Sequence, residues 1–324
     1  MSVFTQPVTE DEADIRLDRW FRRHFPVLTQ GMIQKLCRTG QIRVDGKRAD
    51  AATRLQPGQQ IRVPPLPEGP PPPAPRAPLD PATMRELEGM VVYMDDALIV
   101  MNKPHGLPVQ GGPGIVRHLD GMMDDFRQGA ADKPRLVHRI DMDTSGLLLL
   151  ARTPGIAAKL ASAFRSRHVQ KTYWAVVAGR PSPQEGRIDA ALVKFGGLRG
   201  GERVALAAEG EEDSTHAITD YRTMDAAGRK LTWLELSPLT GRTHQLRVHC
   251  AALGTPIVGD RKYGGEAGQV EGLAAKLHLH ARRLVLPHPL GGTLELEADL
   301  PAHMQETFKA LGFEAPRSKK AVLF

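Results

Sequence analysis

The sequence predicts an α+β protein made of two domains. Short strand-like stretches outnumber long amphipathic helices along most of the chain, which favours a sheet-based main domain. Pro64 to Pro81 holds ten of the 26 prolines, a density that neither a helix nor a central strand tolerates. With 324 residues, the chain is long enough for a domain on each side of this segment. We expect an N-terminal tail at 1–14, a small domain at 15–63, a proline-rich linker at 64–85, a large domain at 86–314 and a basic tail at 315–324.

The overall charge suits a polyanionic partner such as nucleic acid, because the formal net charge is +6 and the pI is about 9.4. Cys37 and Cys250 lie far apart in apolar surroundings, which indicates neither a disulfide framework nor a zinc site. The acidic N-terminal stretch 1–14 has no apolar core segment, so we expect neither a secretory signal nor a transit peptide. These features predict a cytoplasmic, soluble monomer that does not bind membranes.

The small domain is predicted to contain two short helices followed by a hairpin. Apolar residues share a helical face from Ile15, and a second face follows the break at Pro26, around Ile33 to Cys37. Gln41 to Lys47 alternates and ends in an Asp-Gly pair typical of a tight turn, and Ile61 to Val63 offers another strand.

This domain is strongly basic. Between Arg16 and Arg48, nine basic residues stand against two acidic ones, an excess of +7. Charge alone is equally consistent with a solvated face and with phosphate binding. The order RLDRWF, MIQKLCRTGQIRVDGKR and LQPGQQIRV resembles the S4 domain, a small module whose paired helices present basic residues to structured RNA. That resemblance implies RNA docking by Arg16, Arg19, Lys35, Arg38, Arg43, Lys47 and Arg48.

The large domain is predicted to be rich in strands. Met90 to Lys103 favours two strands around an acidic turn, and the continuous apolar run Leu147 to Ala151 favours a strand buried on both faces. Further along we expect a helix at Ile156 to Phe164, strands at Val169 to Val177 and Leu231 to Leu236, a surface loop at 196–213, and a helix that ends near Gly254.

The segment LVHRIDMDTSGLLLLA places an acidic turn directly before the buried strand. Taken alone, Asp141 and Asp143 are most simply turn residues that bond to nearby backbone. The whole string, however, resembles the HRLD-x-x-TSG-LLL signature of the RluA family of RNA pseudouridine synthases, in which the aspartate after HRL is catalytic. Ile140 stands where that family usually has leucine, a substitution that conserves volume. The resemblance implies that Asp141 is the catalytic carboxylate.

Three further segments carry the same resemblance: NKPHGLPVQGG, KTYWAVV and GRTHQLRVH. By this match Tyr173 lies over the target base and Arg247 is the basic partner of Asp141. The resemblance and the position of neighbouring residues imply substrate binding by Arg139, Arg242, Lys171, His138 and Thr144.

Four of the histidines in the second half of the chain, in two pairs, could suggest a metal. His244 and His249 have no third ligand of suitable type and spacing, and His278 and His280 lie in a strand-like stretch. We expect structural histidines at all four positions, no metal site and no cofactor.

The family resemblance implies a catalytic domain built on a large mixed, mainly antiparallel sheet flanked by helices. It also implies isomerisation of uridine to pseudouridine. The enzyme moves C1′ of the ribose from a ring nitrogen to a ring carbon, which requires a carboxylate near the sugar and a flipped nucleotide. The segments MIQKLCRTGQIRVDGKR and VQGGPG resemble those of family members that modify large-subunit rRNA, and this resemblance implies 23S (large-subunit) ribosomal RNA as substrate.

Alternatives remain open at this stage. The chain could act on other rRNA or tRNA sites, or be a non-catalytic RNA-binding protein on the same scaffold. A glycosidase that uses Asp141 and Asp143 as its two carboxylates is a third alternative.

Overall fold

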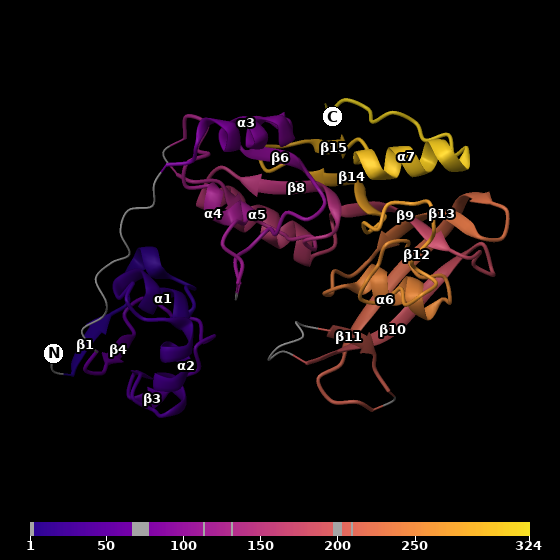
Figure 1. The fold of residues 1–324 in the computed structure, drawn as a ribbon. Coiled ribbons are helices and arrows are strands. Elements are labelled where there is room, and N and C mark those ends of the chain that lie inside the picture. Colours follow the sequence, from indigo (N-terminus) through magenta and orange to yellow (C-terminus); the bar gives the residue numbers. More distant parts are fainter. Residues whose placement is uncertain (1–2, 67–77, 113, 131, 197–202, 209) are drawn as a thin grey trace. The chain divides into compact units, whose positions relative to one another are not determined.

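The chain divides into two compact units, Met1–Pro78 and Leu79–Phe324, each with its own core (Figure 1). The computed structural model describes residues 3–66, 78–112, 114–130, 132–196, 203–208 and 210–324.

The first unit packs two helices on a small antiparallel sheet. The helices are α1 (Leu17–His24) and α2 (Gln30–Arg38), and the strand order is β1 (Phe4–Pro7), β4 (Gln60–Val63), β2 (Arg43–Val44), β3 (Lys47–Arg48). Trp20, Phe21, Ile33 and Ile61 are fully buried between the two layers. The predicted helix pair and hairpin are confirmed.

The expectation of an N-terminal tail at 1–14 is wrong. β1 pairs antiparallel with β4, and the short helix η1 (Glu10–Glu12) follows it. Glu12 is buried, and its carboxylate accepts a hydrogen bond from Trp20 Nε1 (2.9 Å) and contacts His24 Nε2 (2.5 Å). Burial opposes ionisation of Glu12, but the hydrogen bonds from His24, the Thr9 backbone and Trp20 outweigh it and lower the pKa to about 2. The ionised side chain therefore fastens this segment to α1.

The second unit is built on one large sheet. Its helices are α3 (Pro81–Met90), α4 (Leu119–Met122), α5 (Pro154–Arg165), α6 (Gln245–Ala252) and α7 (Ala302–Leu311). Its strands are β5 (Val91–Met94), β6 (Leu98–Lys103), β7 (Arg135–Leu136), β8 (Ser145–Ala151), β9 (Gln170–Ala178), β10 (Glu185–Phe195), β11 (Arg203–Leu206), β12 (Thr215–Ala227), β13 (Leu231–Pro238), β14 (Leu279–Pro287), β15 (Thr293–Glu297) and β16 (Val322–Leu323).

The strand order is β11-β10-β12-β13-β9-β14-β8-β6-β5, with β15 and β7 paired to β14 and β8, and β16 to β15. Within the described residues, β8 and β14 pair in parallel and the other named strand pairs are antiparallel. The large mixed, mainly antiparallel sheet is therefore confirmed.

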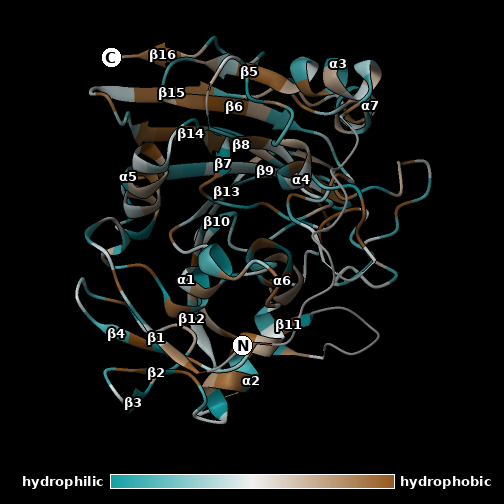
Figure 2. Ribbon diagram, turned by 90° about the vertical axis from the view of Figure 1, so that its left-hand side faces the viewer, coloured by the Kyte–Doolittle hydropathy of each residue, from teal (hydrophilic) through white to brown (hydrophobic). Residues whose placement is uncertain are grey.

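β8 is the buried centre of one half of this sheet. Every residue of the strand is buried, and its leucines alternate between two cores. Leu147 and Leu149 pack with residues of α5, whereas Leu148 and Leu150 pack with residues of α3 and α4. Figure 2 shows α5 on one side of the hydrophobic strands and α3 and α4 on the other. A strand covered on both faces has a continuous apolar sequence, as the run of leucines predicted.

Other boundaries differ from the sequence-based expectations. α3 begins at Pro81, inside the stretch 64–85 expected as linker, because proline is compatible with the first helical turn and Asp80 caps the helix. β11 lies inside the expected loop 196–213, and β16 lies inside the expected tail 315–324. Residues 67–77, the middle of the linker, lie outside the described residues. Among the helices that the structure describes, none is long and apolar enough to cross a membrane.

Gly146 joins the acidic turn to β8 and lies against β14. Its φ is 109°, in the region that favours glycine, and a Cβ built there would lie 2.3 Å from the Ala281 carbonyl oxygen. Gly146 thus combines a positive φ with a close approach to the neighbouring strand β14.

We expect Gly146→Ala to destabilise the protein by several kcal/mol, because both backbone strain and the clash with Ala281 must be relieved by moving β8 away from β14. Gly155→Ala is the matched control. Gly155 lies in α5, and a Cβ there meets nothing within 4 Å, so this substitution should stabilise by about 0.5–1 kcal/mol. Urea unfolding of both variants measures the difference. Equal stability of the two variants would contradict this account of Gly146.

Candidate active site

Three segments that are distant in sequence line one pocket of about 580 Å³ in the second unit. They are the turn before β8, the start of β9 with the end of α5, and the start of α6. The structure brings together all eight residues predicted for catalysis and substrate binding: Asp141, Tyr173, Arg247, Arg139, Arg242, Lys171, His138 and Thr144.

A buried lysine fixes the turn that carries Asp141. The Lys103 ammonium donates hydrogen bonds to the carbonyl oxygens of Pro104 (2.8 Å), Leu107 (2.9 Å) and Met142 (2.9 Å). The Met142 carbonyl also accepts a bond from the backbone of Gly106 (2.9 Å). Burial lowers the pKa of Lys103 to about 7, against the charges of Asp143 and Asp141. Two of its three donors thus hold the loop that follows β6, and the third holds the turn that carries Asp141.

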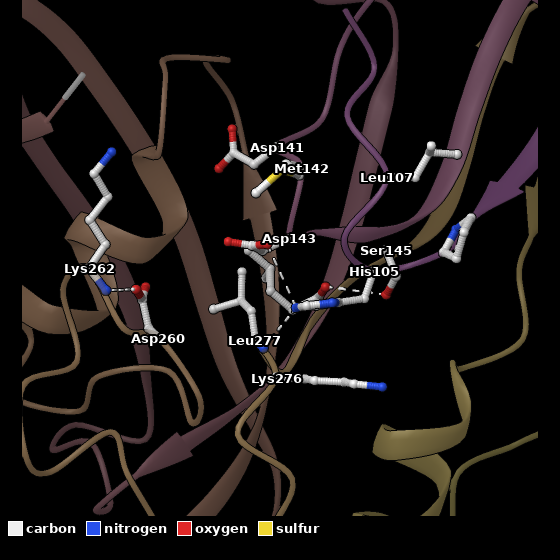
Figure 3. A network of polar contacts seen from close by, with 12 residues as sticks. His105, Leu107, Asp141, Met142, Asp143, Ser145, Asp260, Lys262, Lys276 and Leu277 are labelled. Atoms are coloured by element: carbon white, nitrogen blue, oxygen red, sulfur yellow. Dashed lines mark hydrogen bonds and ion pairs between the residues drawn. The ribbon is translucent and has the colours of Figure 1, made fainter. Parts of the chain in front are cut away.

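The two aspartates of this turn have different surroundings. Asp141 lines the pocket, whereas Asp143 does not. Oδ1 of Asp143 instead lies 3.9 Å from His105 Nε2. Figure 3 shows Asp143 beside His105 and Leu277, with Asp141 further along the same turn. Both aspartates precede β8, so they lie in a turn and not on one face of a strand. The pocket therefore contains the Asp141 carboxylate without Asp143.

Arg247 is shared between two aspartates. Its guanidinium donates two hydrogen bonds to Asp260, Nε to Oδ2 (2.8 Å) and Nη2 to Oδ1 (2.7 Å). The remaining nitrogen, Nη1, lies 3.8 Å from Asp141 Oδ2. The side chains of Arg247 and Asp260 are 6% and 1% exposed, and that of Asp141 is 21% exposed. The predicted pairing with Asp141 exists, but the tighter partner is Asp260.

Asp260 is the residue of this centre that the sequence did not reveal. Its Oδ1 also accepts hydrogen bonds from the backbone of Lys262 (2.9 Å) and Tyr263 (3.0 Å). Burial alone would raise its pKa, but the hydrogen bond and charge of Arg247 outweigh burial and lower it. An aspartate in the turn-like stretch VGDRKYGG gives no signal of its own, because such residues usually bond only to nearby backbone.

His244 belongs to the pocket, which corrects the expectation of a purely structural histidine. Its Nδ1 lies 2.6 Å from the Tyr263 hydroxyl, and its Nε2 lies 4.0 Å from Asp141 Oδ2. Its backbone is left-handed, with φ at 52°, which is uncommon for a residue with a side chain. This conformation directs the chain into α6 and places the imidazole beside Asp141.

The other three of these four histidines, His249, His278 and His280, contact neighbouring groups of the fold. His278 contacts the Lys276 carbonyl and Thr307, and His280 contacts Ser145 and the Ala298 carbonyl. His249 contacts Thr219 through Nδ1, and its Nε2 has no hydrogen-bond partner among the residues that the structure describes. Within the residues that the structure describes, no three metal-binding side chains form a cluster.

His138 lines the pocket but its ring serves the fold. Nε2 accepts a hydrogen bond from the backbone of Leu149 (2.9 Å), and the ring stacks on Phe164 with centroids 4.6 Å apart. Burial lowers its pKa to about 3, so the ring is neutral. The prediction that His138 binds substrate is therefore not supported by these contacts, which use its ring to join β8 to α5.

Tyr173 and Lys171 share one face of β9 toward the pocket. Burial, and after it the charge of Asp141, raise the pKa of Tyr173, so its phenol is protonated at neutral pH. Burial, and after it the charge of Arg167, lower the pKa of Lys171. The Lys171 ammonium also donates to the Thr240 carbonyl at 3.4 Å. The pocket thus presents a neutral aromatic ring beside several cations.

The predicted RNA-docking residues of the first unit differ in whether their side chains already bond to other groups of the unit. Arg16 forms two hydrogen bonds with the buried Asp18, which ties it to the fold. Arg43 donates to the carbonyls of Gly40 and Gly46 in its own turn. The exposed basic residues of this group that have no ion pair or hydrogen bond of their side chains within the described part of the unit are Arg19, Lys35, Arg38, Lys47 and Arg48.

Comparison with known proteins gives two family matches. The family described as RNA pseudouridylate synthase matches residues 97–252, and the S4 domain matches residues 15–61. Ribosomal large subunit pseudouridine synthase C of Rickettsia bellii (strain RML369-C) is 35% identical over 293 residues, which cover 89% of this chain and 95% of the relative. RNA pseudouridine synthase 4, mitochondrial, of Arabidopsis thaliana is 36% identical over 374 residues, which cover 90% of this chain and 78% of the relative.

Among solved structures, human RNA pseudouridylate synthase domain containing 4 is similar in fold. Its TM-score is 0.61 at 28% sequence identity, and the match covers 73% of this chain and 98% of that chain.

We expect Arg247→Ala to destabilise the second unit by about 3–5 kcal/mol, because it leaves the Asp260 carboxylate buried and unpaired. Arg242→Ala is the control. Arg242 is exposed and bonds to the His216 carbonyl, so its removal should change the free energy of unfolding by less than about 1 kcal/mol.

The double variant Arg247→Met with Asp260→Leu should be more stable than Arg247→Ala, because no buried charge remains unpaired. Denaturant unfolding of all these variants measures the differences. A double variant no more stable than Arg247→Ala would show that the destabilisation comes from packing and not from the ion pair.

Proposed function

This chain belongs to the RluA family of RNA pseudouridine synthases, and from that premise we propose that it isomerises specific uridines of large-subunit ribosomal RNA, with Asp141 as the catalytic carboxylate. The observation that carries the assignment of residues is the pocket in which Asp141, Tyr173 and Arg247 meet from three separate segments. The relatives named as large-subunit synthases, which this chain matches along nearly their whole length, support ribosomal RNA as the substrate.

Asp141 is suited to the first step, cleavage of the bond from C1′ to the uracil nitrogen. Positive charge develops at C1′ during cleavage, and a carboxylate beside it can add to that carbon or remove a sugar proton. Arg247 Nη1 lies 3.8 Å from Asp141 Oδ2, so the cation faces the carboxylate without donating a direct hydrogen bond to it. The carboxylate therefore keeps lone pairs for the substrate.

Tyr173 is suited to holding the detached base. A neutral phenol ring offers a stacking surface to uracil while it rotates from nitrogen to carbon attachment. Because the target atoms are inaccessible in a stacked helix, the nucleotide must be flipped into the pocket. Arg139 and Arg242 are exposed at the pocket and are placed to contact the surrounding phosphates.

Two alternatives are less favoured. A glycosidase with paired carboxylates would need Asp143 in the pocket, where it does not lie. A non-catalytic RNA-binding protein would not need Asp141, Tyr173 and Arg247 together. We further propose that the protein acts as a monomer in the cytoplasm. The two buried cysteines are both free, which suits a reducing compartment.

We expect Asp141→Asn to lower the rate of pseudouridine formation by roughly a thousandfold or more while RNA binding survives, because the amide keeps the shape but removes the charge and the nucleophile. Asp143→Asn should remain active. Mapping pseudouridine in large-subunit rRNA from cells that carry each variant, compared with cells lacking the protein, measures the result. An inactive Asp143 variant beside an active Asp141 variant would exchange their roles.

The basic surface of the first unit should contribute to RNA affinity through phosphates. We expect neutralising Arg19, Lys35 and Arg38 to glutamine to make the log–log dependence of affinity on salt shallower, by about 0.7–0.9 for each phosphate that the variant no longer neutralises. The matched control neutralises Arg85, Arg180 and Lys309, which are exposed on the second unit. Equal salt dependence of the two triple variants would show that this surface of the first unit is merely solvated.

A further inference from the structure

The end of α5 contains an arginine where the backbone favours glycine. α5 ends at Arg165, and the His168 backbone donates to the Ala163 carbonyl (3.1 Å), the bond that typically closes a helix through a left-handed residue. That residue is Arg167, with φ at 61°. A side chain in this conformation costs about 1 kcal/mol compared with glycine. The fold alone would therefore be better served by a glycine at position 167.

Both arginines at this helix end line the pocket that contains Asp141. They are exposed, and within the described part of the chain no hydrogen bond or ion pair engages either guanidinium. The acidic group of the pocket, Asp141, has the Arg247 guanidinium (3.8 Å) and the His244 imidazole (4.0 Å) as neighbours, and neither is an arginine of this helix end. The positive charge of Arg165 and Arg167 is thus not neutralised by a partner among the described residues.

A third cation adds to this concentration of charge. Lys171 follows on β9 and lines the same pocket, and burial, followed by the charge of Arg167, lowers its pKa. Like charges held together destabilise one another until an anion binds between them. The arrangement in the free protein is that of a site prepared for an anion.

The usual structural explanation covers only part of these observations. A cation in the last turn of a helix interacts favourably with the helix dipole, which accounts for Arg165. It does not account for Arg167, which lies beyond the last turn and in the left-handed region. Strained residues that persist beside a pocket commonly have a role there.

We propose that Arg165 and Arg167 form a phosphate subsite that holds the RNA backbone beside the flipped uridine. A guanidinium presents paired donors that match phosphate oxygens, and the RNA substrate brings phosphates to both sides of the target nucleotide. Lys171 contributes charge from the pocket wall. The subsite rests on the RNA substrate proposed above and extends it to residues that the sequence did not single out.

The test is Arg167→Gly in the full-length protein. It should leave the melting temperature unchanged or raise it, because the left-handed strain is relieved. The same substitution should weaken binding to an unmodified transcript of large-subunit rRNA by roughly tenfold, as expected on removal of one charge-assisted hydrogen bond. Between about 50 and 200 mM salt, the log–log slope of affinity should become shallower by about 0.7.

Two controls separate the contributions. Gln128→Gly relieves another left-handed residue, with φ at 48°, that does not line the pocket, so it should change stability and not affinity. Arg229→Gly removes an exposed positive charge from the turn between β12 and β13, also outside the pocket, so it should change neither the affinity nor the salt slope appreciably. Arg165→Gln should weaken binding in the same direction as Arg167→Gly.

An Arg167→Gly protein with wild-type affinity and salt slope would overturn the proposal, as would one that is less stable than the wild type. Failure of the proposed function is distinguishable from these outcomes. If the wild-type protein formed no pseudouridine in ribosomal RNA, the substrate assignment would fail, whereas the comparison of RNA affinities among the variants would still decide whether Arg167 contacts phosphate.

Discussion

The pocket depends on the ion pair between the buried guanidinium of Arg247 and Asp260. It is fixed by two hydrogen bonds to Asp260, whose carboxylate is in turn held by the backbone of Lys262 and Tyr263. An arginine with such a partner needs little further ordering when it meets substrate. Because the two strong bonds go to Asp260, Arg247 offers Asp141 charge at 3.8 Å and leaves its oxygens accessible. Asp260 therefore fixes the cation, and Asp141, the carboxylate proposed to be catalytic, keeps its oxygens free of a hydrogen bond from Arg247.

The backbone of the turn that carries Asp141 is also fixed by a buried cation, Lys103. Lys103 is fully buried, yet each of its three donors has a carbonyl partner, one of them in the turn itself. Gly146 then lets the chain enter β8 in contact with β14. A carboxylate on a surface loop would sample many positions, whereas this one is held between a buried lysine and a strand covered on both faces. The precision of the site comes from the core of the sheet.

The sequence predicted those helices, strands and turns whose structure is determined by neighbouring residues. The run of leucines in β8, the apolar faces of α1 and α5 and the Asp-Gly turn before β3 each have a periodicity or turn chemistry of their own. β1 was missed because four residues that end in proline carry no such pattern, and its pairing with β4 joins segments more than fifty residues apart. β11 was missed because its glycine-rich flank resembles a loop.

The sequence predicted which residues line the pocket but not the hydrogen bonds among them, because those bonds depend on contacts between distant segments. Asp141, Tyr173 and Arg247 stand in recognisable strings, whereas Asp260 acquires its importance only when the chain folds back onto α6. His244 is a similar case, since a left-handed backbone at the start of a helix cannot be read from residue type when the residue is not glycine. Arg167 is the converse: its type is ordinary for a helix end and only its conformation is not. A residue whose conformation contradicts its local preference is held by longer-range demands, and both His244 and Arg167 line the pocket where such demands converge.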